Sequence, residues 1–269
     1  MCEAGAVLLG LMNDPARPLA DELARIAGLG FELVDLTLEP QGAWPVDPAE
    51  VRRALDEHGL RAIGHTAPFL PFASAFPELE RAGRDLFVRA CEAFAEIGVT
   101  LVNLHPAMRG LRGRDAVERN TEAVAEVAAP AGKLGLTLMV ENMGGGFGTP
   151  EELAPLVDAA PNVRFHLDIG HANVRPYGQP NRLAPLLEAF GDRIAHVHVH
   201  DNKGRYDEHL PLGVGTVDWV ASARALRGIG YDGTVTLEVF AKEPAYTEAS
   251  RRLWLDWWAA AASPAGQQG

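Results

Sequence analysis

The chain has 269 residues, 47% of them apolar, and a formal net charge of −12. This length fits one large domain, and no apolar run is long enough to span a bilayer, so we expect no membrane contact. The acidic balance disfavours a nucleic-acid surface, which needs clustered Lys and Arg, and the lack of an export signal together with only two cysteines, Cys2 and Cys91, predicts a cytoplasmic protein.

Taken in chain order, eight short segments rich in Val, Leu and Ile have the near-continuous apolar character of strands that are covered on both faces. They are residues 6–12, 31–38, 61–66, 100–105, 136–142, 163–169, 194–200 and 233–240. Helical spacing alternates with them, in residues 17–29, 48–58, 77–97, 115–134, 150–159, 181–190, 217–229 and 246–260.

A glycine stands just before the next strand at five helix ends, where a left-handed cap is needed: Gly30, Gly59, Gly98, Gly135 and Gly230. Eight repeats of strand and helix predict an α/β fold, a single (β/α)8 TIM barrel, since right-handed crossovers leave few alternatives. A doubly wound open sheet is the alternative. We expect the barrel to span residues 1–262 and residues 263–269 to form a flexible tail.

Side chains that bind metals follow the predicted strands at their carboxyl ends. In a barrel these ends meet at one mouth, which predicts a metal cluster there. Glu141 and Glu238 are buried carboxylates that need a cation; an ion pair with Arg is the alternative, but Arg61 and Arg164 stand at strand starts. The predicted cluster consists of His65, His105, Glu141, Asp168, His171, His198 and Glu238.

The alternation of side chains along a strand predicts which histidines lie on the same face of the sheet. His166 shares a face with Asp168, whereas His171 must lie beyond the strand, in a loop that curls back. His196, His198 and His200 also share one face, and three inward imidazoles are hard to explain as an ordinary core, because their ring nitrogens need partners.

The segment 198–215 adds Asp207 and His209, spaced so that both side chains can face one ion. Mixed His and carboxylate ligands suit Zn, Mn, Fe or Co, and the lack of Cys among them disfavours a thiolate zinc site. Lys203, Asn142 and Arg175 are expected substrate contacts. We expect loop aromatics to wall the pocket, namely Phe69, Phe72, Phe147 and Trp219.

Six motifs that extend over nearly the whole chain resemble the xylose-isomerase-like TIM-barrel superfamily, which includes sugar and sugar-phosphate isomerases and epimerases and DNA repair enzymes of the endonuclease IV type. The motifs are GHTAPF at 64–69, NLHPA at 103–107, VENMGGGFGT at 140–149, LDIGH at 167–171, HVHDNKGRYDEHLPLG at 198–213 and LEVF at 237–240.

The resemblance implies two ligand sets and two activities. In the isomerases and epimerases, four ligands would be Glu141, Asp168, His198 and Glu238, with Glu141 and Glu238 also moving protons through a metal-stabilised enediolate. In the endonucleases, His65, His105, His171, Asp207 and His209 would join them around two or three zinc ions. Between one and three divalent ions, drawn from Zn, Mn, Co, Fe and Mg, are therefore implied.

The opening LLGLMNDPARP differs from the small-residue start of the endonucleases, and the acidic charge also disfavours DNA. We therefore expect a metal-dependent sugar or sugar-phosphate isomerase or epimerase with a carbohydrate substrate, and keep an AP-endonuclease-like phosphodiesterase, with nucleic acid as partner, as the alternative. A barrel with purely structural ions fits poorly, because the ligands exceed one closed shell. A homo-oligomer is compatible with the sequence.

Overall fold

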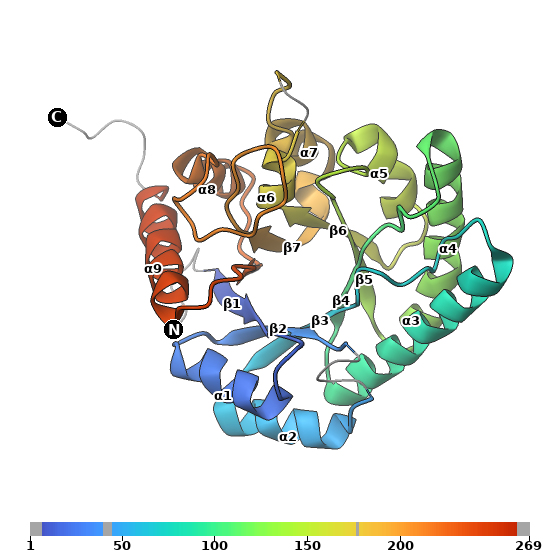
Figure 1. The fold of residues 1–269 in the computed structure, drawn as a ribbon, viewed down its shortest axis with the longest axis horizontal. Helices are drawn as coiled ribbons and strands as arrows, with labels where there is room; N and C mark the ends of the chain where they lie inside the picture. The colour runs from blue at the N-terminus through green and yellow to red at the C-terminus, as the bar shows by residue number, and fades with distance from the viewer. Residues whose placement is uncertain (1–6, 40–44, 176–177, 263–269) are drawn as a thin grey trace.

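The computed structural model describes residues 7–39, 45–175 and 178–262 and contains a closed parallel barrel in the strand order β1 to β8 (Figure 1). This confirms the predicted (β/α)8 barrel, and the doubly wound open sheet is wrong. The strands are β1 (Leu8–Met12), β2 (Leu33–Thr37), β3 (Arg61–His65), β4 (Leu101–Leu104), β5 (Thr137–Glu141), β6 (Val163–Asp168), β7 (Ile194–Val199) and β8 (Thr234–Leu237).

The helices lie outside the ring of strands, as Figure 1 shows. They are α1 (Leu19–Gly28), α2 (Pro48–His58), α3 (Pro77–Ile97), α4 (Gly113–Lys133), α5 (Pro150–Val157), α6 (Ile169–Asn173), α7 (Leu183–Phe190), α8 (Trp219–Gly228) and α9 (Pro244–Ala260), with a 3-10 turn η1 (Gly191–Arg193) before β7. None of these helices is long and apolar enough to cross a membrane.

The predicted left-handed glycines are confirmed, since all five have positive φ, from 64° at Gly59 to 101° at Gly98. The predicted loop after β6 is wrong. The sequence predicts a loop after Asp168, but α6 begins there, because the carboxylate of Asp168 accepts a hydrogen bond from the backbone N–H of His171 at 2.7 Å. The helical turn, rather than a curling loop, brings His171 back beside Asp168.

Alternation along the strands separates two cores. Outward-facing residues such as Val34, Val140 and Leu167 pack beneath the helices. Inward-facing Leu33, Ile63 and Met139 form a small separate cluster in the lumen. Two residues further along the same three strands come Asp35, His65 and Glu141, so the lumen changes from apolar to ionisable toward the carboxyl ends of the strands.

Strand β8 ends at Leu237, so Glu238 lies just beyond it rather than inside the strand as the sequence suggests. His200 likewise follows β7. The predicted tail 263–269 and Cys2 lie outside the described residues. Cys91 is buried in the core, and burial raises the pKa of its thiol to about 12.

Candidate metal centre

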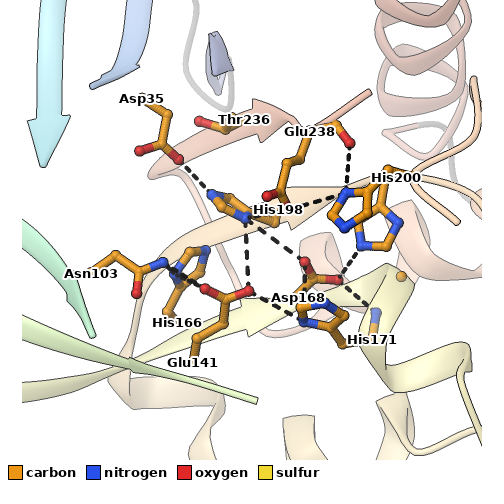
Figure 2. A network of polar contacts seen from close by, with 12 residues as sticks. Asp35, Asn103, Glu141, His166, Asp168, His171, His198, His200, Thr236 and Glu238 are labelled. Atoms are coloured by element: carbon orange, nitrogen blue, oxygen red, sulfur yellow. Dashed lines mark hydrogen bonds and ion pairs between the residues drawn. The ribbon is translucent and has the colours of Figure 1, made fainter. Parts of the chain in front are cut away.

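Four predicted ligands meet at the carboxyl end of the barrel. Glu141 and Asp168 are the last residues of β5 and β6, His198 is on β7, and Glu238 follows β8. Their nearest ligand atoms all lie within 4.8 Å of one another, and all four side chains are buried (Figure 2). We call these four residues the central group. It combines three carboxylates with one imidazole in a buried space.

Histidines surround the carboxylates of the central group. Burial alone would raise the pKa of Glu141, but His166 and His105 hold it well below its ordinary value. Burial also opposes ionisation of Glu238, yet His209 and His198 lower its pKa to about 2. Both glutamates are therefore ionised at neutral pH.

The sequence left open an ion pair between the buried carboxylates and an arginine. Within the described residues, every ion pair of Glu141 and Glu238 is to a histidine, and the same holds for Asp35 and Asp168. Arg164, on β6, instead donates to the carbonyls of Pro161 and Val163 at the start of the strand. The arginine alternative is therefore wrong, because histidines are the partners of these carboxylates in the described residues.

A second group, the β3–β4 group, comprises His65, His105 and Glu141. His105 Nε2 lies 3.0 Å from Glu141 Oε2, and the imidazole rings of His65 and His105 are 4.8 Å apart. Glu141 belongs to both this group and the central group. One carboxylate therefore joins two adjacent places where an ion fits.

A third group, the α6–β7 group, comprises His171, His200, Asp207 and His209. Asp207 Oδ2 lies 3.1 Å from both His171 Nε2 and His209 Nε2. His171 Nδ1 faces Glu141 Oε1 at 3.2 Å, which connects this group to the centre. Gly170 has no room for a side chain, because the imidazole of His200 occupies that space.

Several ligand atoms in these groups are buried without a hydrogen-bond partner in the part of the chain that the structure describes. They include Glu141 Oε1, Asp168 Oδ2, His65 Nδ1, His105 Nδ1 and His200 Nε2. A buried polar atom without a hydrogen-bond partner is unfavourable, and ions bound in these groups would supply ligand bonds to such atoms. The mixture of imidazole and carboxylate suits a borderline divalent metal such as Zn, Mn, Fe or Co.

Four residues that sequence reasoning left out of the ligand set also reach the centre, and one is His166, whose Nδ1 lies 3.4 Å from Glu141 Oε2. Asp35 Oδ2 lies 2.5 Å from His198 Nε2, and Asn103 Nδ2 donates to Glu141 Oε2 at 2.5 Å. His200 joins the α6–β7 group. A carboxylate in the apolar strand Leu33–Thr37 could have identified Asp35 from the sequence alone. No sequence pattern indicated the partners of Asn103.

The segment that carries Asp207 and His209 is held by a buried carboxylate, that of Asp201. Its two oxygens accept hydrogen bonds from four N–H groups, those of the Asn202, Gly213 and Val217 backbone and the Trp219 indole. The backbones of Asp201 and Leu210 also pair with each other. A loop fixed at both ends can present two ligands without strand support.

The expected substrate contacts divide. Asn142 is fully buried, its amide donates to the Asp168 carbonyl at 2.9 Å, and its oxygen accepts from the Asp168 N–H at 2.8 Å, so it orients Asp168 and does not face a substrate. Arg175 and Lys203 line an open pocket beside His171 and Asp207.

The expected aromatic walls are mostly wrong. Three of the four aromatic side chains pack against apolar neighbours in the hydrophobic core and do not line the pocket: Phe72, Phe147 and Trp219. Phe69 is exposed.

Residues 23–257 match the family model described as xylose isomerase-like TIM barrel. A ketose 3-epimerase of Arthrobacter globiformis is 29% identical over 250 residues, covering 86% of this chain and 81% of its own. The crystal structure of a D-tagatose 3-epimerase-like protein superposes with a TM-score of 0.82 at 24% identity, covering 95% of this chain and 98% of that one. A Thermus thermophilus protein soaked with ZnCl2 gives a TM-score of 0.74 at 26% identity, covering 93% and 99%.

Proposed function

Since the chain belongs to the xylose isomerase-like TIM barrel family, we propose that it is a divalent-metal-dependent isomerase or epimerase of ketose sugars. One observation carries the proposal: two ionised glutamates, Glu141 and Glu238, extend from separate strands of the barrel into one buried group with Asp168 and His198. The ketose 3-epimerase relative, aligned over most of both chains, supports the same class of reaction.

The proposed ligands of the catalytic ion are Glu141, Asp168, His198 and Glu238. A divalent ion bound there would polarise the substrate carbonyl and acidify the neighbouring C–H. The protein supplies the proton movements. One ionised glutamate accepts the proton from that carbon.

The other proton transfer sets the product. The glutamate that took the proton can deliver it to the adjacent carbon, which gives an isomer. An epimer forms when the other glutamate, after taking up a proton from solvent, protonates the opposite face of the same carbon. Glu141 and Glu238 approach the centre from β5 and from the end of β8, so each is available to a different side of a bound sugar. Asn103 holds Glu141 in place through the 2.5 Å hydrogen bond.

A second candidate function, a metal-dependent phosphodiesterase, is favoured by the three adjoining groups. The β3–β4 and α6–β7 groups flank the centre, and together the three contain every ligand that the endonuclease resemblance implies. Multinuclear sites of this kind stabilise both the attacking and the leaving oxygen of a phosphoryl displacement. The ketose reaction needs only the central group.

The two functions separate in one set of assays. Protein purified without added metal is analysed for metal content, loaded with Zn, Mn or Co, and incubated with five- and six-carbon ketoses in D2O. We expect deuterium from solvent to appear on the carbon next to the carbonyl, detected by NMR, together with a new epimer or isomer. About three ions per chain with cleavage of a duplex that contains an abasic site, and no ketose turnover, would overturn the proposal in favour of the phosphodiesterase.

A further inference from the structure

An open pocket of about 1220 Å³ adjoins the α6–β7 group, with His171 and Asp207 in its wall. Four basic side chains also line it: Arg175, Arg182, Lys203 and Arg205. This is an unusual concentration of positive charge for a chain with a net charge of −12. Like charges gathered at one place repel each other unless an anion joins them.

Two of the four cations, Arg175 and Arg182, are held in place by hydrogen bonds. Arg182 Nη2 donates to the carbonyls of Gly144 and Val174. Arg175 donates through Nε to the Gln179 carbonyl at 2.8 Å and through Nη1 to the Asn173 side chain at 2.6 Å. Carbonyl and amide oxygens orient these guanidinium groups, but they do not neutralise their charge.

A matched glycine makes room for one of these guanidinium groups. A side chain at Gly148 would collide with Nη1 of Arg182, so the loop before α5 admits the guanidinium only because glycine stands there.

The other two cations, Lys203 and Arg205, are exposed on the loop that follows β7. Neither forms an ion pair within the described residues, and the Arg205 guanidinium lies over the Tyr206 ring, 5.0 Å from its centre. The one acidic residue in the pocket wall, Asp207, is already paired with His171 and His209. No other carboxylate lies in the described part of the wall. Glu152, outside the wall, acts electrostatically on Arg182, whereas Arg175, Lys203 and Arg205 form no ion pair within the described residues.

His171 lies between the pocket and the central group. His171 faces Asp207 on the pocket side and Glu141 on the central side, at 3.1 and 3.2 Å. A ligand that occupies both therefore needs a polar sugar portion near Glu141 and an anionic portion a few bonds away. Planar guanidinium groups and an ammonium group are the usual partners of a phosphoryl group.

We propose that this pocket binds the phosphoryl group of the substrate, so that the substrate is a phosphorylated ketose; this rests on the proposed function. Four cations at one place suit a single dianionic group. A nucleic-acid backbone would instead need basic residues spread along a surface, and the acidic net charge disfavours that.

The test compares two double variants that remove the same charge. K203A/R205A alters the pocket, whereas K133A/R53A removes two exposed cations, one on α4 and one on α2. Each metal-loaded protein is titrated calorimetrically with inorganic phosphate and with D-fructose 6-phosphate. The ratio of kcat/KM for phosphorylated over unphosphorylated ketoses is then measured across a panel of matched pairs.

We expect K203A/R205A to weaken binding of both phosphate ligands, and to lower that ratio, by about tenfold or more, while K133A/R53A matches the wild type. Binding that the pocket variant weakens, with no turnover of any ketose, would support the anion site and contradict the proposed function alone. Equal binding by both variants would place the phosphate on the ions and overturn the inference. Weakened binding of duplex DNA, with no preference for phosphorylated ketoses, would also overturn it.

Discussion

Asp35 and His198 are 163 residues apart in the chain, yet Asp35 Oδ2 lies 2.5 Å from His198 Nε2 and both side chains are fully buried. Because Nε2 of His198 is paired with Asp35, Nδ1 is the ring atom that faces the central group, 3.1 Å from Glu238 Oε2. The carboxylate of Asp35 therefore decides which ring nitrogen of His198 is offered to an ion. Carboxylate partners of this kind fix the tautomer of a histidine ligand and increase its basicity.

The first prediction concerns this pair. Asp35→Asn removes the negative charge behind His198, and we expect the metal affinity of the protein to fall by roughly 10- to 100-fold. Competition with a chelating dye measures the change. Asp21→Asn, on the exposed side of α1, is the matched control and should bind metal as the wild type does. Equal affinity in the two variants would exclude the role of Asp35.

The second prediction concerns the two proposed proton-transfer residues. Glu141→Gln and Glu238→Gln each remove one general base, and we expect each to reduce kcat by roughly 10²- to 10⁴-fold. Circular dichroism and metal analysis accompany the kinetics, because both residues are also proposed ligands. Glu188→Gln, exposed on α7, serves as the control. An active Glu141→Gln enzyme with its metal bound would rule out Glu141 as the base.

The third prediction concerns metal removal. The centre gathers buried carboxylates whose partners in the described chain are histidines, so an ion that binds the folded state should stabilise it. We expect dialysis against a strong chelator to lower the Tm by about 10 °C, as follows for an ion present at about 1,000 times its Kd. Scanning calorimetry with and without restored metal measures this. An unchanged Tm, with no metal found by elemental analysis, would contradict a metal centre.

The fourth prediction concerns the pH dependence of the metal-free protein. Burial opposes protonation of His209, but Glu238 and Asp207 raise its pKa to about 9. The pKa values of His171 and His198 are raised well above the ordinary value despite burial, by Asp168 and Glu238 respectively. A raised pKa means that the folded state holds the proton more tightly. The stabilisation is complete below about pH 6.5, the unfolded value, and is lost as the pH rises through about 9.

The measurement is urea unfolding of metal-free protein at a series of pH values between about 6 and 10, which brackets the unfolded and folded pKa values of His209. We expect the free energy of unfolding to decrease across this range. His209→Gln should remove the part of the decrease that lies between about pH 6.5 and about pH 9. A free energy of unfolding that stays constant or increases with pH would contradict these paired histidines.

The fifth prediction concerns the loop behind the α6–β7 group. Asp201→Asn replaces one carboxylate oxygen by an amide that cannot accept the N–H groups it faces. We expect a loss of about 2–4 kcal/mol in the free energy of unfolding, because buried donors lose their partner. Asp192→Asn, exposed before β7, is the control and should be nearly neutral. Equal stability of the two variants would show that Asp201 does not brace the loop.

The sequence by itself determined the barrel and the set of residues at its mouth. Apolar strand segments, helical spacing and glycines at the helix ends all describe one repeated unit, and closure of the parallel sheet brings distant strand ends together without further information. His65, Glu141 and Asp168 could be selected in this way, because each ends a strand.

Only the tertiary structure decided how these residues divide among three groups and what holds them. The hydrogen bond of Asp35 to His198 crosses the lumen from β2 to β7, and that of Asn103 to Glu141 joins the neighbouring strands β4 and β5. No local pattern encodes such pairs. The short helix α6 forms because the side chain of Asp168 caps its first turn. The side-chain amide of Asn142 donates to the backbone carbonyl of Asp168 and is not available to a ligand. Local periodicity reports which face a side chain occupies, whereas its partner depends on which other strands close around it.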